Sequence, residues 1–188
     1  MQQKMIKLAM TCAVVVGMLG CGAQRPVPHS TAKTEIVLKK GGGFFDSPSA
    51  CGFALPSKAY RIRVSHFRSD LPAEKIRHAL RIYRVSGSEP DALARIELYD
   101  NPSALSPDAW ASKHLAWLMG GRSTHEKKHL GKDSLPALII HTPGSPQAYA
   151  SETAVLSNGK RIAVVSGSNL NTEDRKKAFR KILETLYF

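Results

Sequence analysis

The chain has 188 residues, of which 43% are hydrophobic, 22% are charged and 7% are aromatic. That length suits one domain, and a composition with 14 glycines, 11 prolines and no repetitive tract excludes collagen, a coiled coil and wholesale disorder. Lys and Arg number 27 against 15 Asp and Glu, which gives a formal charge of +12. Such a charge attracts anionic partners, although basic residues scattered along a chain usually form a solvated surface.

Residues 1–20 predict a secretory signal peptide. Lys4 and Lys7 form a short positive region, and an uncharged, mostly apolar run follows from Leu8 to Leu19. The run is too short for a membrane-spanning helix, which needs about 20 apolar residues. The alternative is a buried N-terminal helix of the domain, but that helix would need a polar face, and this segment has none.

The end of this segment, Met18-Leu19-Gly20-Cys21, resembles the lipobox of bacterial lipoproteins. The resemblance implies cleavage between Gly20 and Cys21 and a diacylglyceryl thioether on Cys21, which becomes the new N-terminus. Met18 and Leu19 depart from the family's usual Leu followed by Ala or Ser. Gly22 stands where the family's inner-membrane retention signal is typically Asp, so the resemblance implies the outer membrane. Acyl chains tether a protein because each buried CH₂ contributes about 0.8 kcal/mol.

A second cleavage site stays open, because Cys21-Gly22-Ala23 has the small-x-small pattern that an ordinary signal peptidase cuts after Ala23. Cys12 leaves with the signal peptide in both cases. If Cys21 carries lipid, Cys51 is the only thiol left, and we interpret it as a small buried residue. If Cys21 is retained without lipid, a Cys21–Cys51 bridge can form.

Residues 21–34 predict a tether, because they are polar and contain Pro26 and Pro28. A single globular domain is expected over residues 35–188. Its first half predicts strands, which lie at 35–38, 44–45, 60–67, 78–85 and 92–99. A helix over 72–85 is the alternative to the fourth of these strands.

A helix is predicted over Pro107–Met119, since Ser106 is a good N-cap and proline suits the first helical position. On a continuous helix, Trp110, His114, Trp117 and Leu118 share one face. The two tryptophans on that face can bind an aromatic or sugar ligand or pack in the core.

The rest of the chain predicts strands at 136–141, 148–156 and 161–166, and the last two are joined by the hairpin signal Asn158-Gly159. A closing helix is predicted from the N-cap Thr172 to about Leu186. Its spacing buries one set of side chains, namely Phe179, Ile182, Leu183 and Leu186. Its outer face carries Arg175, Lys176, Arg180 and Lys181.

The string His125-Glu126-Lys127-Lys128-His129 has the form H-E-x-x-H. In that zinc-binding pattern two histidines one helical turn apart hold the metal and the glutamate activates water. The corresponding hypothesis is a zinc hydrolase that uses His125, Glu126 and His129. Lys127 and Lys128 count against it, because they bring positive charge close to a cation. The alternative is a charged, solvent-facing strand or loop.

Two further features weaken the zinc hypothesis. Glycines at 120–121 and at 131 leave too little chain for the long apolar helix that should present the ligands. No downstream motif supplies a clear third ligand, although His141 and Glu152 can be offered. The sequence also has no G-x-S-x-G and no Rossmann fingerprint, so we expect neither an enzyme nor a cofactor.

The remaining signal is charge. Arg175, Lys176, Arg180 and Lys181 form a candidate surface for anionic lipid, glycan or nucleic acid. Specific nucleic-acid binding is not expected, because aromatic residues do not alternate with the basic ones as they do in single-strand binders.

Three strings carry a second resemblance: Arg95–Pro102, Leu105–Trp110 and Ile182–Phe188. Together they resemble small bacterial envelope lipoproteins with a PsbP-like α/β sandwich, over residues 50–188. The resemblance implies a non-enzymatic accessory or binding role. Independently, strands in a meander before a terminal helix indicate an α+β domain, with a middle helix and a C-terminal helix packed against an antiparallel sheet.

The sequence therefore predicts a cell-envelope lipoprotein on the outer membrane, facing the periplasm, with a non-catalytic binding or assembly domain. Its expected partners are the membrane, through the lipid on Cys21, and an envelope protein or an anionic polymer.

Overall fold

The structure is a computed structural model that describes residues 36–39, 43–46, 50–64, 76–86 and 89–188. The predicted signal peptide, the tether, and Cys21 with both of its cleavage sites lie outside the described residues. Residues 34–188 make one compact unit. Among the described helices, none has both the length and the apolar character needed to cross a membrane.

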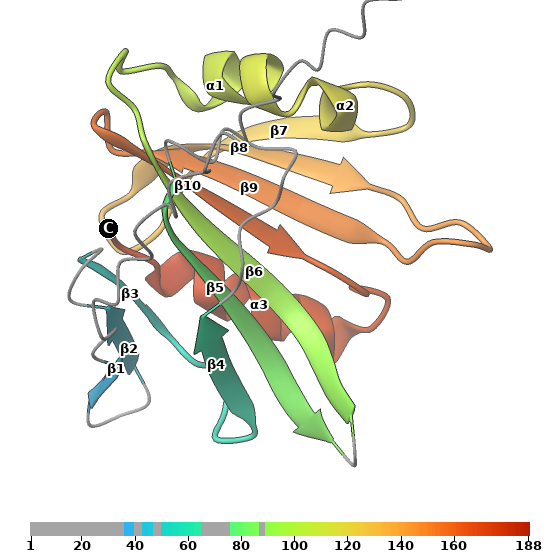
Figure 1. The fold of residues 1–188 in the computed structure, drawn as a ribbon. Helices are drawn as coiled ribbons and strands as arrows, with labels where there is room; N and C mark the ends of the chain where they lie inside the picture. Colours follow the sequence, from blue (N-terminus) through green and yellow to red (C-terminus); the bar gives the residue numbers. More distant parts are fainter. Residues whose placement is uncertain (1–35, 40–42, 47–49, 65–75, 87–88) are drawn as a thin grey trace, which may run out of the picture. The chain divides into compact units, whose positions relative to one another are not determined.

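Seven strands form one antiparallel sheet in the order β4-β5-β6-β10-β9-β8-β7 (Figure 1). Their bounds are β4 (Tyr60–Val64), β5 (Ile76–Ser86), β6 (Glu89–Asp100), β7 (Thr124–Leu130), β8 (Leu135–Thr142), β9 (Ser151–Ser157) and β10 (Arg161–Gly167). Two meanders, β4 to β6 and β7 to β10, join where β6 pairs with β10. The sequence predicts an α+β domain, and the structure confirms its antiparallel sheet together with a small number of helices.

A second, three-stranded antiparallel sheet consists of β1 (Ile36–Lys39), β2 (Gly43–Asp46) and β3 (Cys51–Ala54). The sequence predicts β1 and β2 but not β3. The backbone of Gly52 in β3 exchanges two hydrogen bonds of 2.9 Å with Tyr187 near the other end of the chain. A Cβ at this glycine would lie 2.3 Å from the Tyr187 ring, so the close approach needs glycine. Cys51, beside it, is fully buried as interpreted.

The strand prediction for 78–85 is confirmed, and the helical alternative is wrong for the part that the structure describes. Leu80 and Ile82 are buried, and their cross-strand partners are Ile96 and Ala94 of β6. The apolar side chains therefore repeat with the strand period of two, and burial against β6 outweighs the helix propensity of the segment.

Strand alternation gives the large sheet two faces. We call one the α3 face; it carries Leu80, Ile96, Ala154, Leu156 and Val165, which cluster with Phe179 and Ile182 of α3 (Glu173–Thr185). We call the other the α1 face; it carries Tyr99, Leu138, Ile140, Val155 and Val164, which cluster with Trp110 and Leu115. Figure 1 shows α3 crossing the sheet, whereas α1 (Pro107–His114) and α2 (Ala116–Met119) lie over its β7–β8 end.

The predicted helix over Pro107–Met119 is correct at its start and wrong in its continuity. Ser106 caps it by accepting a 3.3 Å hydrogen bond from the backbone N–H of Ala109. Leu115 then leaves the helical conformation, with φ −125° and ψ 29°, and separates α1 from α2. Leu115 itself is buried. The break means that Trp110 and Trp117 do not share a face, since Trp110 is 3% exposed and Trp117 is 60% exposed.

The closing helix matches its prediction. Thr172 is the N-cap of α3, and its side chain accepts a 3.4 Å hydrogen bond from the backbone N–H of Arg175. The four side chains expected to face inward are all buried, namely Phe179, Ile182, Leu183 and Leu186.

Candidate anion-binding cleft

The H-E-x-x-H string lies on strand β7, not on a helix. His125 pairs with Ile140 of β8 and His129 pairs with Pro136. Both histidines lie on the α1 face, the side on which Lys127 reaches Asp108 of α1 at 2.5 Å. Four residues of strand span about 13 Å, which is too far for two ligands of one zinc ion. Among the described residues, no group of three His, Cys, Asp or Glu side chains could hold a metal.

Glu126 lies on the α3 face, apart from the two histidines, and meets His141 of β8. Its Oε2 lies 3.8 Å from Nε2 of His141, whose Nδ1 lies 3.0 Å from Oε2 of Glu152. Lys128 sits two residues along the same side of β7, with Nζ 2.8 Å from Oε1 of Glu126. That hydrogen bond is the largest cause that lowers the pKa of the Glu126 carboxyl below its ordinary value. Of the two residues offered as third zinc ligands, His141 thus contacts both Glu126 and Glu152, and Glu152 contacts His141.

His141 and Glu152 form one wall of a cleft of about 250 Å³ between the sheet and α3. Helix α3 supplies Lys176 and Arg180 to the opposite wall, and Arg122 comes from the segment before β7. Arg122 and Arg180 are both exposed. Leu170 and Phe179 give the cleft an apolar part. The lining therefore includes three cations and one carboxylate, which lies beside His141.

The four basic residues that the sequence places on α3 have different surroundings in the structure. Lys176 and Arg180 line the cleft, and Nζ of Lys176 also lies 2.8 Å from Oε1 of Glu173. Lys181 donates a 3.3 Å hydrogen bond to the carbonyl of Pro56 and does not line the cleft.

Arg175 does not belong to an open basic surface. Its guanidinium pairs with the carboxylate of Asp91 and donates hydrogen bonds to the carbonyls of Ala92, at 2.6 Å, and Ser168, at 3.1 Å. Its side chain is 13% exposed. A helical wheel predicts which side of α3 carries this residue, but not that the start of β6 and the segment after β10 pack there.

Arg122 was missed by sequence reasoning, and His141 and Glu152 were considered only as zinc ligands. Strand alternation is the signal that places the last two together, because they pair across β8 and β9 on the same face. No comparable local signal exists for Arg122, which joins the cleft through the tertiary fold. Guanidinium groups bind carboxylates and phosphates through paired hydrogen bonds, so this arrangement can hold a small anion.

In comparisons with protein-family models and with curated proteins, nothing matches this chain. The lipobox and the PsbP-like sandwich therefore stay resemblances of the sequence. The residues that line the cleft are the part of the molecule that indicates a function.

Proposed function

We propose that the chain is a bacterial cell-envelope lipoprotein, lipid-anchored at Cys21 in the outer membrane, whose periplasmic domain binds a small anionic ligand without catalysis. The observation that carries the binding role is the cleft beside α3, where Arg122, Lys176 and Arg180 outnumber the carboxylate of Glu152. The signal-peptide pattern and the cysteine at its end support the anchor.

The proposal includes the finer architecture expected from the sequence, a middle helix and a C-terminal helix packed against the sheet. Trp110 and Leu115 share a buried cluster with Ile140, which supports the first packing. Phe179 shares another with Leu156, which supports the second. Helices that bury both faces of the sheet would hold the walls of the cleft in place.

The size and lining of the cleft favour a small ligand or the charged end of a larger one. Pockets for drug-sized ligands have volumes of about 300–1,000 Å³, and this one has about 250 Å³. Arg122 and Arg180 supply planar guanidinium groups that match a carboxylate or phosphate, and Lys176 supplies a compact point charge. Phe179 and Leu170 can contact the apolar part of the same ligand.

Calorimetric titration of the purified mature protein with inorganic phosphate and with succinate tests the binding role. Arg180→Gln removes one charged donor, so we expect the dissociation constant to rise by about tenfold. Lys177→Gln is the matched control, since Lys177 is an exposed cation on the same helix that does not line the cleft. Affinity should also fall steeply with added salt. Equal affinities for the two variants, or binding that does not depend on salt, would contradict the proposal.

The anchor has its own test, which is the intact mass of the protein recovered from the membrane fraction of its native host. A diacylated or triacylated Cys21 is the expected result. An unmodified chain that begins at Gln24 would overturn the anchor and leave the binding role of the cleft standing.

A further inference from the structure

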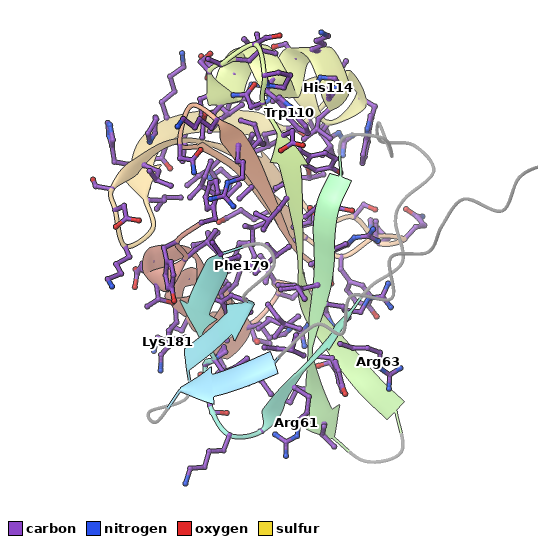
Figure 2. The ribbon with its side chains drawn as sticks, turned by 60° about the vertical axis from the view of Figure 1, so that its left-hand side comes forward. Arg61, Arg63, Trp110, His114, Phe179 and Lys181 are labelled. Atoms are coloured by element: carbon purple, nitrogen blue, oxygen red, sulfur yellow. The ribbon has the colours of Figure 1, made fainter. Side chains whose placement is uncertain are left out.

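Three arginines stand side by side on the α1 face of the sheet. Arg63 of β4 pairs with Arg81 of β5, and Arg81 pairs with Arg95 of β6. Residues that pair directly across antiparallel strands point to the same face, with Cβ atoms about 4.5–5.5 Å apart. We call Arg63, Arg81 and Arg95 the arginine row. Figure 2 shows Arg61 and Arg63 at the end of the sheet far from Trp110 and His114.

The arginine row is only partly neutralised. The guanidinium of Arg95 lies 2.6 Å from the carboxylate of Glu97, and the two side chains are 13% and 1% exposed. Arg63 and Arg81 are exposed, and the guanidinium of Arg63 lies 5.6 Å from the centre of the Tyr83 ring. Within the described part of the chain, no carboxylate pairs with either of them. Like charges directly opposite each other destabilise a sheet, so the fold does not benefit from this row.

Hydroxyl groups continue the row across the sheet. Ser166 of β10 pairs with Arg95, and Thr153 of β9 pairs with Ser166. The hydroxyls of Thr153 and Ser166 lie 3.4 Å apart. Arg81, Arg95, Thr153 and Ser166 all line a cavity of about 390 Å³. Cationic donors therefore lie next to neutral hydrogen-bonding groups in one continuous hollow.

An exposed tryptophan borders the same cavity. Trp117 and Leu118 of α2 are among its lining residues, and Trp117 is 60% exposed. The break at Leu115 separates Trp117 from the buried Trp110, so core packing does not account for it. A flat indole ring that is open to solvent offers an apolar face beside the cations and hydroxyls.

We propose that this cavity binds an acidic saccharide, a sugar that carries carboxylate or phosphate groups. Arg81 in the cavity lining binds an acidic group, and Arg63, which pairs with Arg81 outside the lining, binds an acidic group that extends from the cavity. Thr153 and Ser166 bind sugar hydroxyls, and Trp117 stacks on the apolar face of a sugar ring. A membrane surface is the less favoured occupant, because the row and its hydroxyls lack the broad apolar face with which peripheral proteins enter a bilayer. The site goes beyond the proposed function, since it lies on the other face of the sheet from the cleft and uses neither Lys176 nor Arg180.

Tryptophan fluorescence of the mature full-length protein tests the site, because the chain has two tryptophans and Trp110 is buried. The probes are trigalacturonate, which carries carboxylates, and glucosamine 6-phosphate, which carries phosphate. We expect at least one to change the fluorescence saturably, whereas the neutral trisaccharide maltotriose does not. Binding of neither acidic probe, or equal binding of maltotriose, would overturn the proposal.

The variant Arg81→Thr tests whether the saccharide binds at the arginine row. Loss of a charged donor should raise the dissociation constant for the acidic saccharide by about tenfold or more. Arg84→Thr is the matched control, since Arg84 is an exposed arginine of the same strand that pairs with Tyr60 and points to the other face. Because removing a like charge relieves repulsion and threonine favours strands, Arg81→Thr should not lower the melting temperature. Equal affinity in the two variants would overturn the site.

Two further measurements separate this site from the alternatives. In calorimetric titrations, Trp117→Ala should lower the affinity for the acidic saccharide and leave the affinity for inorganic phosphate unchanged. Arg180→Gln should leave saccharide affinity unchanged, because that residue belongs to the cleft on the other face. If neither acidic sugar binds but phosphatidylglycerol vesicles do, and Arg81→Thr abolishes that vesicle binding, the site recognises a membrane surface. This result would overturn the saccharide proposal.

Discussion

Arg175 should contribute to stability and not to ligand binding. It joins the start of α3 to the sheet through the carboxylate of Asp91 and the carbonyls of Ala92 and Ser168. A hydrogen bond that involves a charged group contributes about 1.5–3 kcal/mol. The Asp91 side chain is 39% exposed, so solvent screens the ion pair and its share must be discounted. We therefore expect Arg175→Ala to lower the free energy of unfolding by about 2–3 kcal/mol.

Urea denaturation followed by circular dichroism measures this loss. The midpoint should fall while the slope with urea stays the same, since the variant unfolds the same surface. Lys177→Ala is the matched control, because Lys177 is exposed two residues along the same helix, and its change should stay within about 0.5 kcal/mol. If Arg175→Ala and Lys177→Ala unfold at the same urea concentration, the assignment of Arg175 to the fold is refuted.

Three more predictions concern single substitutions. Gly167→Ala should destabilise the domain by about 1–3 kcal/mol in thermal denaturation, because its Cβ would lie 2.8 Å from the Phe179 ring; an unchanged melting temperature would contradict this. Asn101→Ala should cost about 2 kcal/mol in urea denaturation, since that buried side chain makes three hydrogen bonds to loop backbone, and a near-neutral result would refute it. Lys128→Ala should raise the pKa of Glu126 toward its ordinary value in an NMR titration, and an unchanged pKa would exclude the hydrogen bond as the cause. Because the pKa of Glu126 is lowered in the folded protein, the stability that its carboxylate provides is lost as the pH falls through the folded-state pKa.

Sequence reasoning succeeds where the signal is local. Asn158-Gly159 predicts the β9–β10 hairpin, and the Asn158 side chain accepts hydrogen bonds from the backbone N–H groups of Lys160 and Arg161, at 3.1 and 2.8 Å. Gly159 has φ +85°, a conformation that glycine adopts without strain. The strand β3 has no such signal, because it forms through its pairing with β2 and the contact of Gly52 with a residue near the C-terminus. Its short sequence is compatible with several structures until that contact exists.

The same limit applies to the helix that was predicted over Pro107–Met119. Its capping signals are local and correct, but the break depends on the burial of Leu115 beside Ile140 and Val155, which belong to strands later in the chain. The two tryptophans therefore have different surroundings. No periodicity within the segment distinguishes Trp110 from Trp117, since a continuous helix would place both on one face.

Charge is concentrated by strand register, not by its density along the sequence. The arginine row consists of Arg63, Arg81 and Arg95, which lie far apart in the sequence. Taken one at a time, each has the sequence pattern of an ordinary solvated charge in a strand. They become neighbours because β4, β5 and β6 pair in one register, and a slip of one residue would move a whole strand's side chains to the other face. The register shift near Ile82 also places Ala92 and Arg95 in the same cavity, although simple alternation puts residues three apart on opposite faces. Basic sites of this kind in other sheets should therefore be sought by pairing strands first and counting charges on each face afterwards.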